Sequence, residues 1–348
     1  MSVLERPWSI LLACLAPLCA TTCSTPAPAD PPSSSSSTSA GDSTSLVGTT
    51  NPDATATATD PDSTGASTGP VVTGTDDTAT TTGPPSTSGC PDDLPASWIL
   101  CEDFETPGGP ETYFGWFWTR AGLMAVESGE AWSGERALRI GHDPAVFGSG
   151  MADLRFGQGT PGGVVHQPDG QFREVWVRFW LRTQPGWPDA GIAEAVEVMS
   201  VTGDTRAIAM DATIYSPTQA QVQALAWSCV HDSDLWCNGS GDWSNPSLEV
   251  RESGLGSSDL YGAAMAGQWQ CHEIHVRLDD PGESNGQFEV SVDGRLEVSL
   301  QEITFFDAWA GAAINNVRFG SFWNAPALID HHVDDVVVAT APVGCPAP

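Results

Sequence analysis

Short runs that alternate apolar and polar residues recur from residue 97 to residue 340, and Gly, Pro, Asp and Asn separate them. This alternation is typical of strands with one buried face, whereas no stretch shows a sustained helical period with capping residues. About a dozen strands in one domain favour two packed sheets, so we expect an all-β antiparallel sandwich. The pattern predicts strands at 97–105, 123–128, 136–142, 151–157, 173–182, 194–201, 206–216, 220–228, 270–279, 286–294, 295–303, 314–323 and 332–340.

The clearest turn lies between the runs "GQFEVSV" and "RLEVSLQEI", which are separated only by Asp293 and Gly294. An Asp-Gly pair tolerates the positive φ angles of a two-residue type I′ turn. The sequence therefore predicts a hairpin centred on these two residues.

The first 23 residues differ from the rest, with Arg6 followed by an apolar run and then small residues. The run is too short for a stable span of a bilayer core of about 30 Å, so it predicts a secretory signal. "ATTC" places Cys23 where bacterial lipoproteins carry their lipidated cysteine, and "LLAC" offers Cys14 as an alternative. We expect an exported protein anchored by lipid at the outer membrane or cell surface, or else a secreted one with incidental cysteines.

Residues 24–89 consist almost entirely of Ser, Thr, Pro, Gly, Ala and Asp. Such a segment buries too little apolar surface to offset its chain entropy, which predicts a disordered tether. Residues 90–348 then form a single folded domain, a length that suits one large all-β unit.

Charge narrows the choice of partners, because the chain has 44 acidic against 13 basic residues and a formal net charge of −31. Nucleic acid binding requires basic patches, so it is excluded. Polyanionic glycans are disfavoured as well, unless the arginines gather in one place.

Six cysteines follow the signal, and an even number in an exported chain predicts disulfides. Cys229 and Cys237 flank a short loop and form the easiest local pair. Cys90 or Cys101 with Cys345 would tie the ends of the domain together. A bond from Cys271 to Cys229, Cys237 or a terminal cysteine would carry the chain across the face of its own strand.

The run "REVWVRFWLR" gives one predicted binding face. Apolar residues alternate with Glu174, Trp176, Arg178, Trp180 and Arg182. Aromatic rings stack on the apolar faces of sugars while Arg and Glu hydrogen-bond hydroxyls, so an exposed row of this kind suits a glycan. The alternative is that loops cover the row and its tryptophans are ordinary packing.

The run "WQCHEIHVRL" adds Glu273, His275 and Arg277 on one side of its strand. Further alternating rows place Asn316 with Arg318, and Asp211 with Thr213 and Tyr215. If these rows share one sheet, four arginines form a cationic strip that would admit an anionic ligand: Arg178, Arg182, Arg277 and Arg318. The alternative for His275 is a structural hydrogen-bonded network with its acidic and basic neighbours.

The string "GQWQCHEIHVRLDDPGESNGQFEVSVDGRLEVS", with "NNVRFGSFW" and "VDDVVVA", resembles the C-terminal half of jelly-roll polysaccharide lyases, particularly polysaccharide lyase family 14. "CEDFET" and "AWSGERALRI" resemble the first strands of modules in the same concanavalin A-like lectin and glucanase superfamily. The resemblance implies a two-sheet jelly roll with a concave face where glycans lie.

The chain differs from that family in residues that the lyases use for catalysis. The lyases use a lysine, an arginine and tyrosines, whereas this chain has no lysine and only Tyr113, Tyr215 and Tyr261. The double-carboxylate row of jelly-roll glucanases is also absent. We therefore expect a carbohydrate-binding protein without catalysis. One alternative is a divergent lyase in which His275 or Tyr215 abstracts a proton and Arg277 neutralises a uronate, and another is a structural or adhesive module without a glycan site.

The resemblance also implies a structural calcium between the first and last strands. Asp103 or Glu105, together with Asp334, match the positions of its ligands. Calcium prefers such oxygen ligands and would relieve repulsion among the acids. The alternative is an acidic rim without metal.

Overall fold

The structure is a computed structural model that describes residues 89–346, apart from 147, 160–161, 189–194, 203–206, 216–219, 232–233, 236–248, 307–310 and 322–326. The chain divides into two units, Met1–Asp77 and Thr78–Pro348, and every described residue belongs to the second. The predicted signal with Cys14 and Cys23, and the tether up to residue 88, lie outside the described residues. Within the described part, no helix has the length and hydropathy needed to cross a bilayer.

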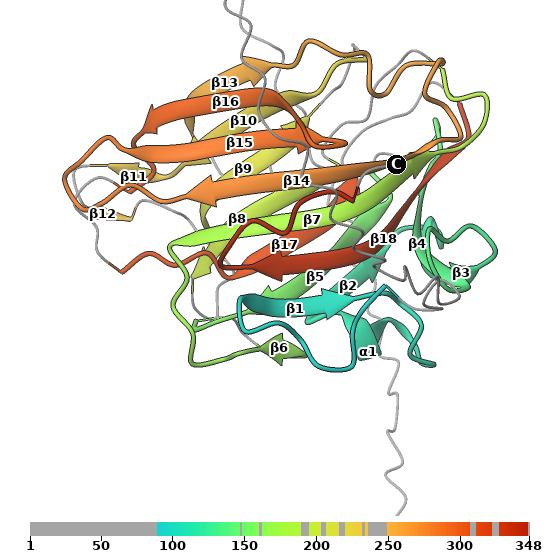
Figure 1. Ribbon diagram of the computed structural model, residues 1–348, viewed down its shortest axis with the longest axis horizontal. Coiled ribbons are helices and arrows are strands. Elements are labelled where there is room, and N and C mark those ends of the chain that lie inside the picture. The colour runs from blue at the N-terminus through green and yellow to red at the C-terminus, as the bar shows by residue number, and fades with distance from the viewer. Residues whose placement is uncertain are drawn as a thin grey trace, which may run out of the picture. The chain divides into compact units, whose positions relative to one another are not determined.

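Two eight-stranded sheets form the domain (Figure 1). Sheet A has the order β16 (Arg295–Ile303), β15 (Gly286–Val292), β14 (Trp269–Arg277), β7 (Glu174–Thr183), β18 (Ile329–Ala339), β4 (Arg136–His142) and β3 (Met124–Ser128), with β1 (Trp98–Glu102) paired to β18. Sheet B has the order β13 (Glu249–Leu255), β10 (Gln223–Ser228), β9 (Ala207–Tyr215), β8 (Val196–Thr202), β17 (Asn316–Ser321), β5 (Gly150–Phe156) and β2 (Trp116–Thr119), with β6 (Val165–His166) parallel to β5. A four-residue helix α1 (Pro110–Tyr113) and a small pair, β11 (Val230–His231) with β12 (Asp234–Leu235), complete the described elements.

This architecture confirms the predicted all-β, two-sheet antiparallel jelly-roll sandwich. Each predicted strand range overlaps a strand of the structure. The strands that the pattern missed are β2, β6, β11, β12 and β13. Most of these are short, and β13 reads "EVRESGL", where charged residues and a glycine mask the alternation.

The core lies between the sheets and follows the alternation of the sequence. In β7, Val175, Val177, Phe179 and Leu181 are buried in the core while the residues between them point outward. Burying a side chain of this size stabilises the fold by about 1.5–3 kcal/mol. The outward-facing side chains of each strand are not needed for the core, so they can serve another function.

The predicted hairpin joins β15 to β16, with Asp293 at φ 49° and Gly294 at φ 76°. Both positive angles match a type I′ turn. Asp293 Oδ1 also accepts the backbone N–H of Cys271 at 2.9 Å, which fastens the turn to β14.

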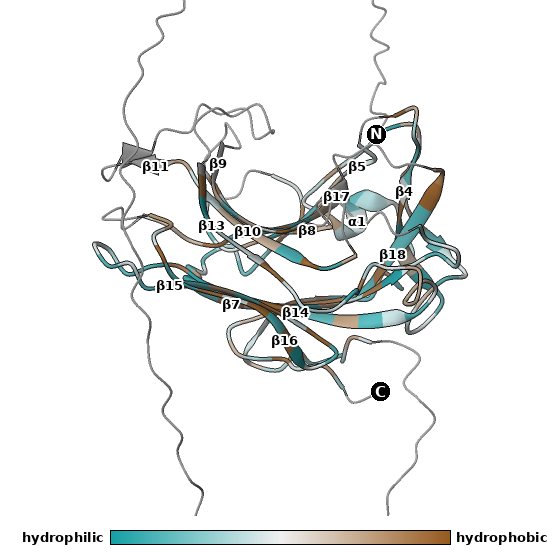
Figure 2. Cartoon of the chain, turned by 90° about the horizontal axis from the view of Figure 1, so that it is seen from above, coloured by the Kyte–Doolittle hydropathy of each residue, from teal (hydrophilic) through white to brown (hydrophobic). Residues whose placement is uncertain are grey.

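The two sheets curve in the same direction (Figure 2). The edges of sheet B bend away from sheet A, so the outer face of sheet B is concave and the outer face of sheet A is convex. The concave face implied by the sequence resemblance thus belongs to β2, β5, β17, β8, β9, β10 and β13.

Two disulfides have both cysteines described, Cys90–Cys101 and Cys271–Cys345. The expectation that Cys90 or Cys101 pairs with Cys345 is wrong, since the first two bond to each other across the start of β1. Of the partners left open for Cys271, the structure shows the terminal Cys345. Cys229 also forms a disulfide, and its predicted partner Cys237 lies outside the described residues.

Candidate functional site

The predicted glycan rows lie side by side on the convex outer face of sheet A, here called the A face. β7 and β14 pair so that Trp176 lies opposite His275, Arg178 opposite Glu273, and Glu174 opposite Arg277. Neighbouring residues of an antiparallel pair point to the same side, so the two rows form one surface. The condition that these two rows share one sheet is therefore met, but they lie on the convex side of the sandwich and not on the concave one.

Segments from the two ends of the domain cap the middle of the A face. Glu273 Oε2 accepts the backbone N–H groups of Val343 at 2.9 Å and Gly344 at 2.6 Å. The Cys271–Cys345 bond holds this C-terminal segment in place. Trp180 is only 4% exposed, because Trp132 stacks on it with ring centroids 3.6 Å apart. The expectation of an open row that includes Trp180 and Glu273 is wrong for these two residues.

The remaining charged groups of the A face are paired or buried. Arg182 forms an ion pair with Glu130 and donates from Nε to the carbonyl of Gly267 at 2.9 Å. Burial lowers the pKa of Arg178, which faces Asp335 and Glu273. The arginines that would bind an anion are thus occupied or enclosed.

His275 lies at the more open end of the A face. Its ring stacks on Trp176 at 4.3 Å, with Nε2 2.9 Å from Glu174 Oε1 and Nδ1 3.3 Å from Glu289 Oε2. Arg277 Nη2 lies 3.1 Å from Asp280 Oδ2. This arrangement matches the structural network that the sequence offered as the alternative to a catalytic base.

Arg318 and Tyr215 lie on the other sheet, on β17 and β9. The predicted strip of four arginines is therefore wrong, because Arg318 lies across the core from Arg178, Arg182 and Arg277. The proposed catalytic grouping of Tyr215 with His275 and Arg277 is wrong for the same reason. Alternation shows which residues share a face of a strand, but it does not show which sheet the strand joins.

The concave outer face of sheet B, here called the B face, carries a buried ionic network. Strand pairing aligns outward residues across the sheet in the order Trp116, Asp153, Arg318, Glu197 and Thr213. Arg318 binds Asp153 through two contacts, Nε to Oδ1 at 2.7 Å and Nη2 to Oδ2 at 3.2 Å. Its Nη1 lies 3.5 Å from Glu197 Oε2, and its guanidinium lies 5.7 Å from the Trp116 ring centre.

Arg155 shares the same carboxylate, with Nη2 3.4 Å from Asp153 Oδ2. Burial by itself would lower the pKa of Arg318, yet Asp153 and Glu197 outweigh burial and raise it. Both arginines of this network are therefore firmly cationic and are held by acids of the same sheet.

A second outward row on the B face runs through Asn316, Met199, Asp211 and Trp227. Burial, together with the neighbouring Glu197, raises the pKa of Asp211 well above its ordinary value. Burial also raises the pKa of the neighbouring Glu197. The protonated form of both carboxyl groups is thus favoured, as expected of close acids in a site of low dielectric.

Asn316 is only 1% exposed, and neither atom of its amide has a hydrogen-bond partner in the described part of the chain. Buried polar groups are nearly always paired, so each such group requires an explanation. Perturbed acids beside unpaired groups on a concave face identify the B face as the candidate site.

The sequence missed Trp116, Asp153, Arg155, Glu197 and Trp227 as members of this site. A signal was present: Asp153 with Arg155 and Glu197 interrupt strands whose other positions are apolar and buried. The pairing of β5, β17, β8 and β9 that brings them together joins segments far apart in the chain.

The residues predicted to bind calcium lie near one another, although their oxygens already accept backbone hydrogens. Asp334 Oδ2 accepts from Trp132 at 2.7 Å and Ser133 at 3.1 Å, and Glu105 Oε1 accepts from Glu135 and Arg136 at 2.7 Å. Asp103 Oδ1 accepts the backbone N–H of Glu105. Within the described residues, no three acidic, His or Cys side chains are gathered as metal ligands. Calcium here stays a prediction that would also need backbone oxygens.

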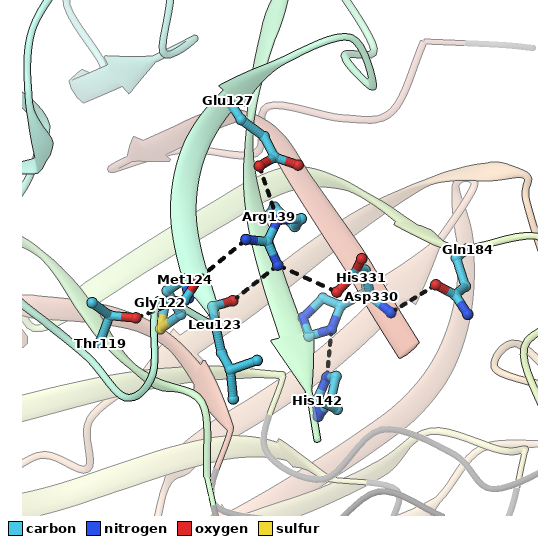
Figure 3. Close-up of polar contacts among 10 residues, drawn as sticks. All are labelled: Thr119, Gly122, Leu123, Met124, Glu127, Arg139, His142, Gln184, Asp330 and His331. Atoms are coloured by element: carbon cyan, nitrogen blue, oxygen red, sulfur yellow. Dashed lines mark hydrogen bonds and ion pairs between the residues drawn. The ribbon is translucent and has the colours of Figure 1, made fainter. Parts of the chain in front are cut away.

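Adjacent His331 and His332 point to opposite faces of β18, which argues against a joint metal site. His331 Nδ1 lies 2.9 Å from His142 Nε2 inside the sandwich, beside the Arg139 network that links Glu127 and Asp330 (Figure 3). Burial lowers the pKa of His142 to about 4. These rings are neutral packing at pH 7.

Comparison with known proteins adds likeness in structure only. No family model matches the chain, and no curated protein matches it at a significant level. Among solved structures, the endo-β-1,4-glucuronan lyase from the fungus Trichoderma reesei is 13% identical, over 70% of this chain and 96% of the lyase, with a TM-score of 0.44. A marine PL-14 alginate lyase from Aplysia kurodai is 10% identical, over 71% of this chain and 100% of the lyase, with a TM-score of 0.49. The cellulose-induced protein Cip1 is 16% identical, over 71% of this chain and 100% of its own, with a TM-score of 0.40. The activities in these names are those of the neighbours.

Proposed function

We propose that the protein binds a polysaccharide on the B face and does not cleave it. The observation that carries this proposal is the amide of Asn316, which is 1% exposed and whose two polar atoms have no hydrogen-bond partner among the described residues, so a ligand has to reach it from the concave side of sheet B. Leaving such a group unpaired costs about 1–3 kcal/mol, and sugar hydroxyls supply both the donors and the acceptors it lacks. Trp116 and Trp227 lie on the outer face of the same sheet, where rings stack on sugars.

The charges of the B face favour binding over β-elimination. A lyase needs a cation that is free to neutralise the uronate carboxylate. Arg318 and Arg155 are instead bound to Asp153, and Glu197 and Asp211 add further acid. We therefore expect no new absorbance from unsaturated uronates when the protein is incubated with alginate or glucuronan.

Asn316→Leu tests the proposal, because it removes the unpaired amide at similar volume. Affinity electrophoresis against a panel of soluble neutral polysaccharides should show at least about a tenfold loss of affinity, equivalent to about 1.4 kcal/mol. The same variant should unfold at an equal or higher urea concentration, since the described part of the chain shows no hydrogen bond that it would break. Trp176→Ala on the A face serves as the matched control and should leave affinity unchanged. Loss of affinity in the control alone would place the site on the A face and overturn the proposal.

Surface anchoring belongs to the same proposal and rests on the sequence alone. A lipid on Cys23 and the tether that follows it would hold the binding domain away from a membrane. Mass spectrometry of the protein expressed in a bacterial host should find an acylated N-terminal Cys23, and Cys23→Ser should release the protein into the medium. Acylation at Cys14, or a free protein without lipid, would refute this assignment.

A further inference from the structure

We propose a second carbohydrate-binding site on the opposite side of the domain, formed by Trp132 on the A face. This site is independent of the B face. Its ligand is an uncharged, hydroxyl-rich polysaccharide that stacks on the outer surface of the indole ring.

Trp132 is a large exposed ring in a fixed position. It is 43% exposed, although one of its faces stacks on Trp180 at 3.6 Å with 17° between the planes. Trp269 meets it edge to face at 6.5 Å. The three rings come from the loop after β3, from β7 and from β14, so their packing fixes a ring that would otherwise rotate.

The backbone that carries Trp132 is also fastened. Asp334 on β18 accepts the N–H groups of Trp132 and Ser133, and Asp335 accepts the hydroxyl of Ser133 at 2.8 Å. A ring held in place before binding loses little conformational entropy when a ligand arrives. The loop therefore presents a rigid aromatic platform.

The surroundings of Trp132 match sugars of no net charge. Glu130 and Glu135 of the same loop are exposed and can accept hydrogen bonds from hydroxyls. Arg182 is already paired with Glu130, so no free cation is available nearby for a uronate. The loop also lines a depression of about 370 Å³, within the range of small-ligand pockets, formed by Ser128, Gly129, Ala131, Gly134 and Glu135.

The size of the apolar surface argues against a protein partner. A stable protein interface buries about 800 Å² on each side with an apolar centre. Among the described residues the other exposed large hydrophobic side chains are Leu94, Trp118, Val250, Leu255, Leu296 and Leu328, and none belongs to the loop of Trp132. A single ring with a polar rim suits a sugar residue better.

Oxidation of exposed tryptophans by N-bromosuccinimide, followed by peptide mass mapping, tests the site in the wild-type protein. Trp132 and Trp118 are the two tryptophans with large exposure in the described residues, at 43% and 37%. Trp118 lies on β2 at the edge of sheet B, so it reports on the B face. Hydroxyethyl cellulose, mixed-linkage β-glucan and galactomannan serve as neutral probes, and alginate serves as the acidic one.

We expect at least one neutral probe to slow the oxidation of Trp132 several-fold, while alginate does not. Unchanged oxidation of Trp132 with every probe would overturn the second site, and protection by alginate alone would overturn its ligand class. Protection of Trp118 without Trp132 would leave the B face supported. Protection of Trp132 without Trp118 would support the second site and count against the first.

Two variants extend the test. Trp132→Phe keeps a stacked ring of smaller area and should bind the protecting probe several-fold more weakly, while Trp132→Ala should lose binding at this site. Asn316→Leu should leave the protection of Trp132 unchanged. If Trp132→Ala does not fold, the binding of Trp132→Phe and the protection from oxidation in the wild-type protein still test the second site.

Discussion

On the A face, Trp180, Glu273 and Arg182 each have a partner from a segment distant in the chain, whereas on the B face Asn316 is buried without one among the described residues. Both faces combine tryptophans, acids and arginines, so residue type alone does not separate them. Single buried atoms without a partner occur on the A face, at Nε of Arg178 and Nε1 of Trp180, but among the described outward-facing residues only Asn316 of the B face has two polar atoms without a partner. The middle of the A face is covered by its own chain, which leaves only the ring of Trp132 open there, whereas the buried amide of Asn316 leaves the B face hydrogen-bonding capacity for a ligand.

The largest difference between the faces should appear when an arginine is removed. Arg318→Met leaves Asp153 and Glu197 without their cation in a buried site, which should lower the unfolding free energy by about 3–5 kcal/mol. Arg182→Met breaks a pair with the exposed Glu130 and a hydrogen bond to the carbonyl of Gly267, and together these should cost about 1–2 kcal/mol. Urea unfolding at pH 7 compares the two variants. Equal losses would mean that the B-face network is no more demanding than a surface ion pair.

The next effect concerns the disulfide that closes the A face. Cys271 and Cys345 are separated by 74 residues, against 11 for Cys90 and Cys101. A disulfide that closes a longer loop removes more chain entropy from the unfolded state. Replacing Cys271 and Cys345 by Ala should therefore lower the unfolding free energy by about 2–5 kcal/mol, and replacing Cys90 and Cys101 should lower it by about 1–2 kcal/mol less. Urea unfolding of the two double variants measures this order. The reverse order would show that the C-terminal segment is held chiefly by its other contacts, including those to Glu273.

The sequence predicted the sandwich because burial forces a two-residue period on each strand, as in Val175, Val177 and Phe179. It left the pairing of β7 with β14 open as a condition, because alternation does not show which strands are neighbours. It misplaced Arg318 and Tyr215, because the choice of sheet is decided by long-range pairing such as Asn316 with Arg155 and Met199. It also misjudged Trp180, since the ring that covers it comes from a loop whose position depends on hydrogen bonds to Asp334.

Asp334, which holds that loop, should give the A face a pH dependence. Burial, and then Asp335, raise its pKa from 3.8 to about 8. Between about pH 4 and pH 8 the folded chain therefore keeps a proton on Asp334 that the unfolded chain has released. The unfolding free energy is thus not reduced by this group below pH 4, and it falls as the pH rises from 4 to 8. The loss is about 1.4 kcal/mol per pH unit.

Asp334→Asn removes this titration and should make the unfolding free energy fall less steeply between pH 5 and 7, measured by urea unfolding in EDTA. The substitution also removes hydrogen bonds to the loop. The resulting loss of unfolding free energy is the same at every pH, so it does not change the slope of unfolding free energy against pH. Parallel curves for the variant and the wild type would contradict the raised pKa.

Calcium should give the smallest effect and would act on the same acids. A cation between the first and last strands would offset the repulsion that Asp103 and Glu105 exert on Asp335. Calcium must compete with the backbone N–H groups bound to Glu105 and with the proton on Asp334, so we expect weak binding. The bound ion should raise the melting temperature by about 2–4 °C, equivalent to about 1 kcal/mol. Because the proton leaves Asp334 as the pH approaches 8, the calcium effect should grow from pH 6 to pH 8 and shrink in Glu105→Gln. Thermal melts with calcium or EDTA that coincide at pH 8 would show that these acids form a rim without metal.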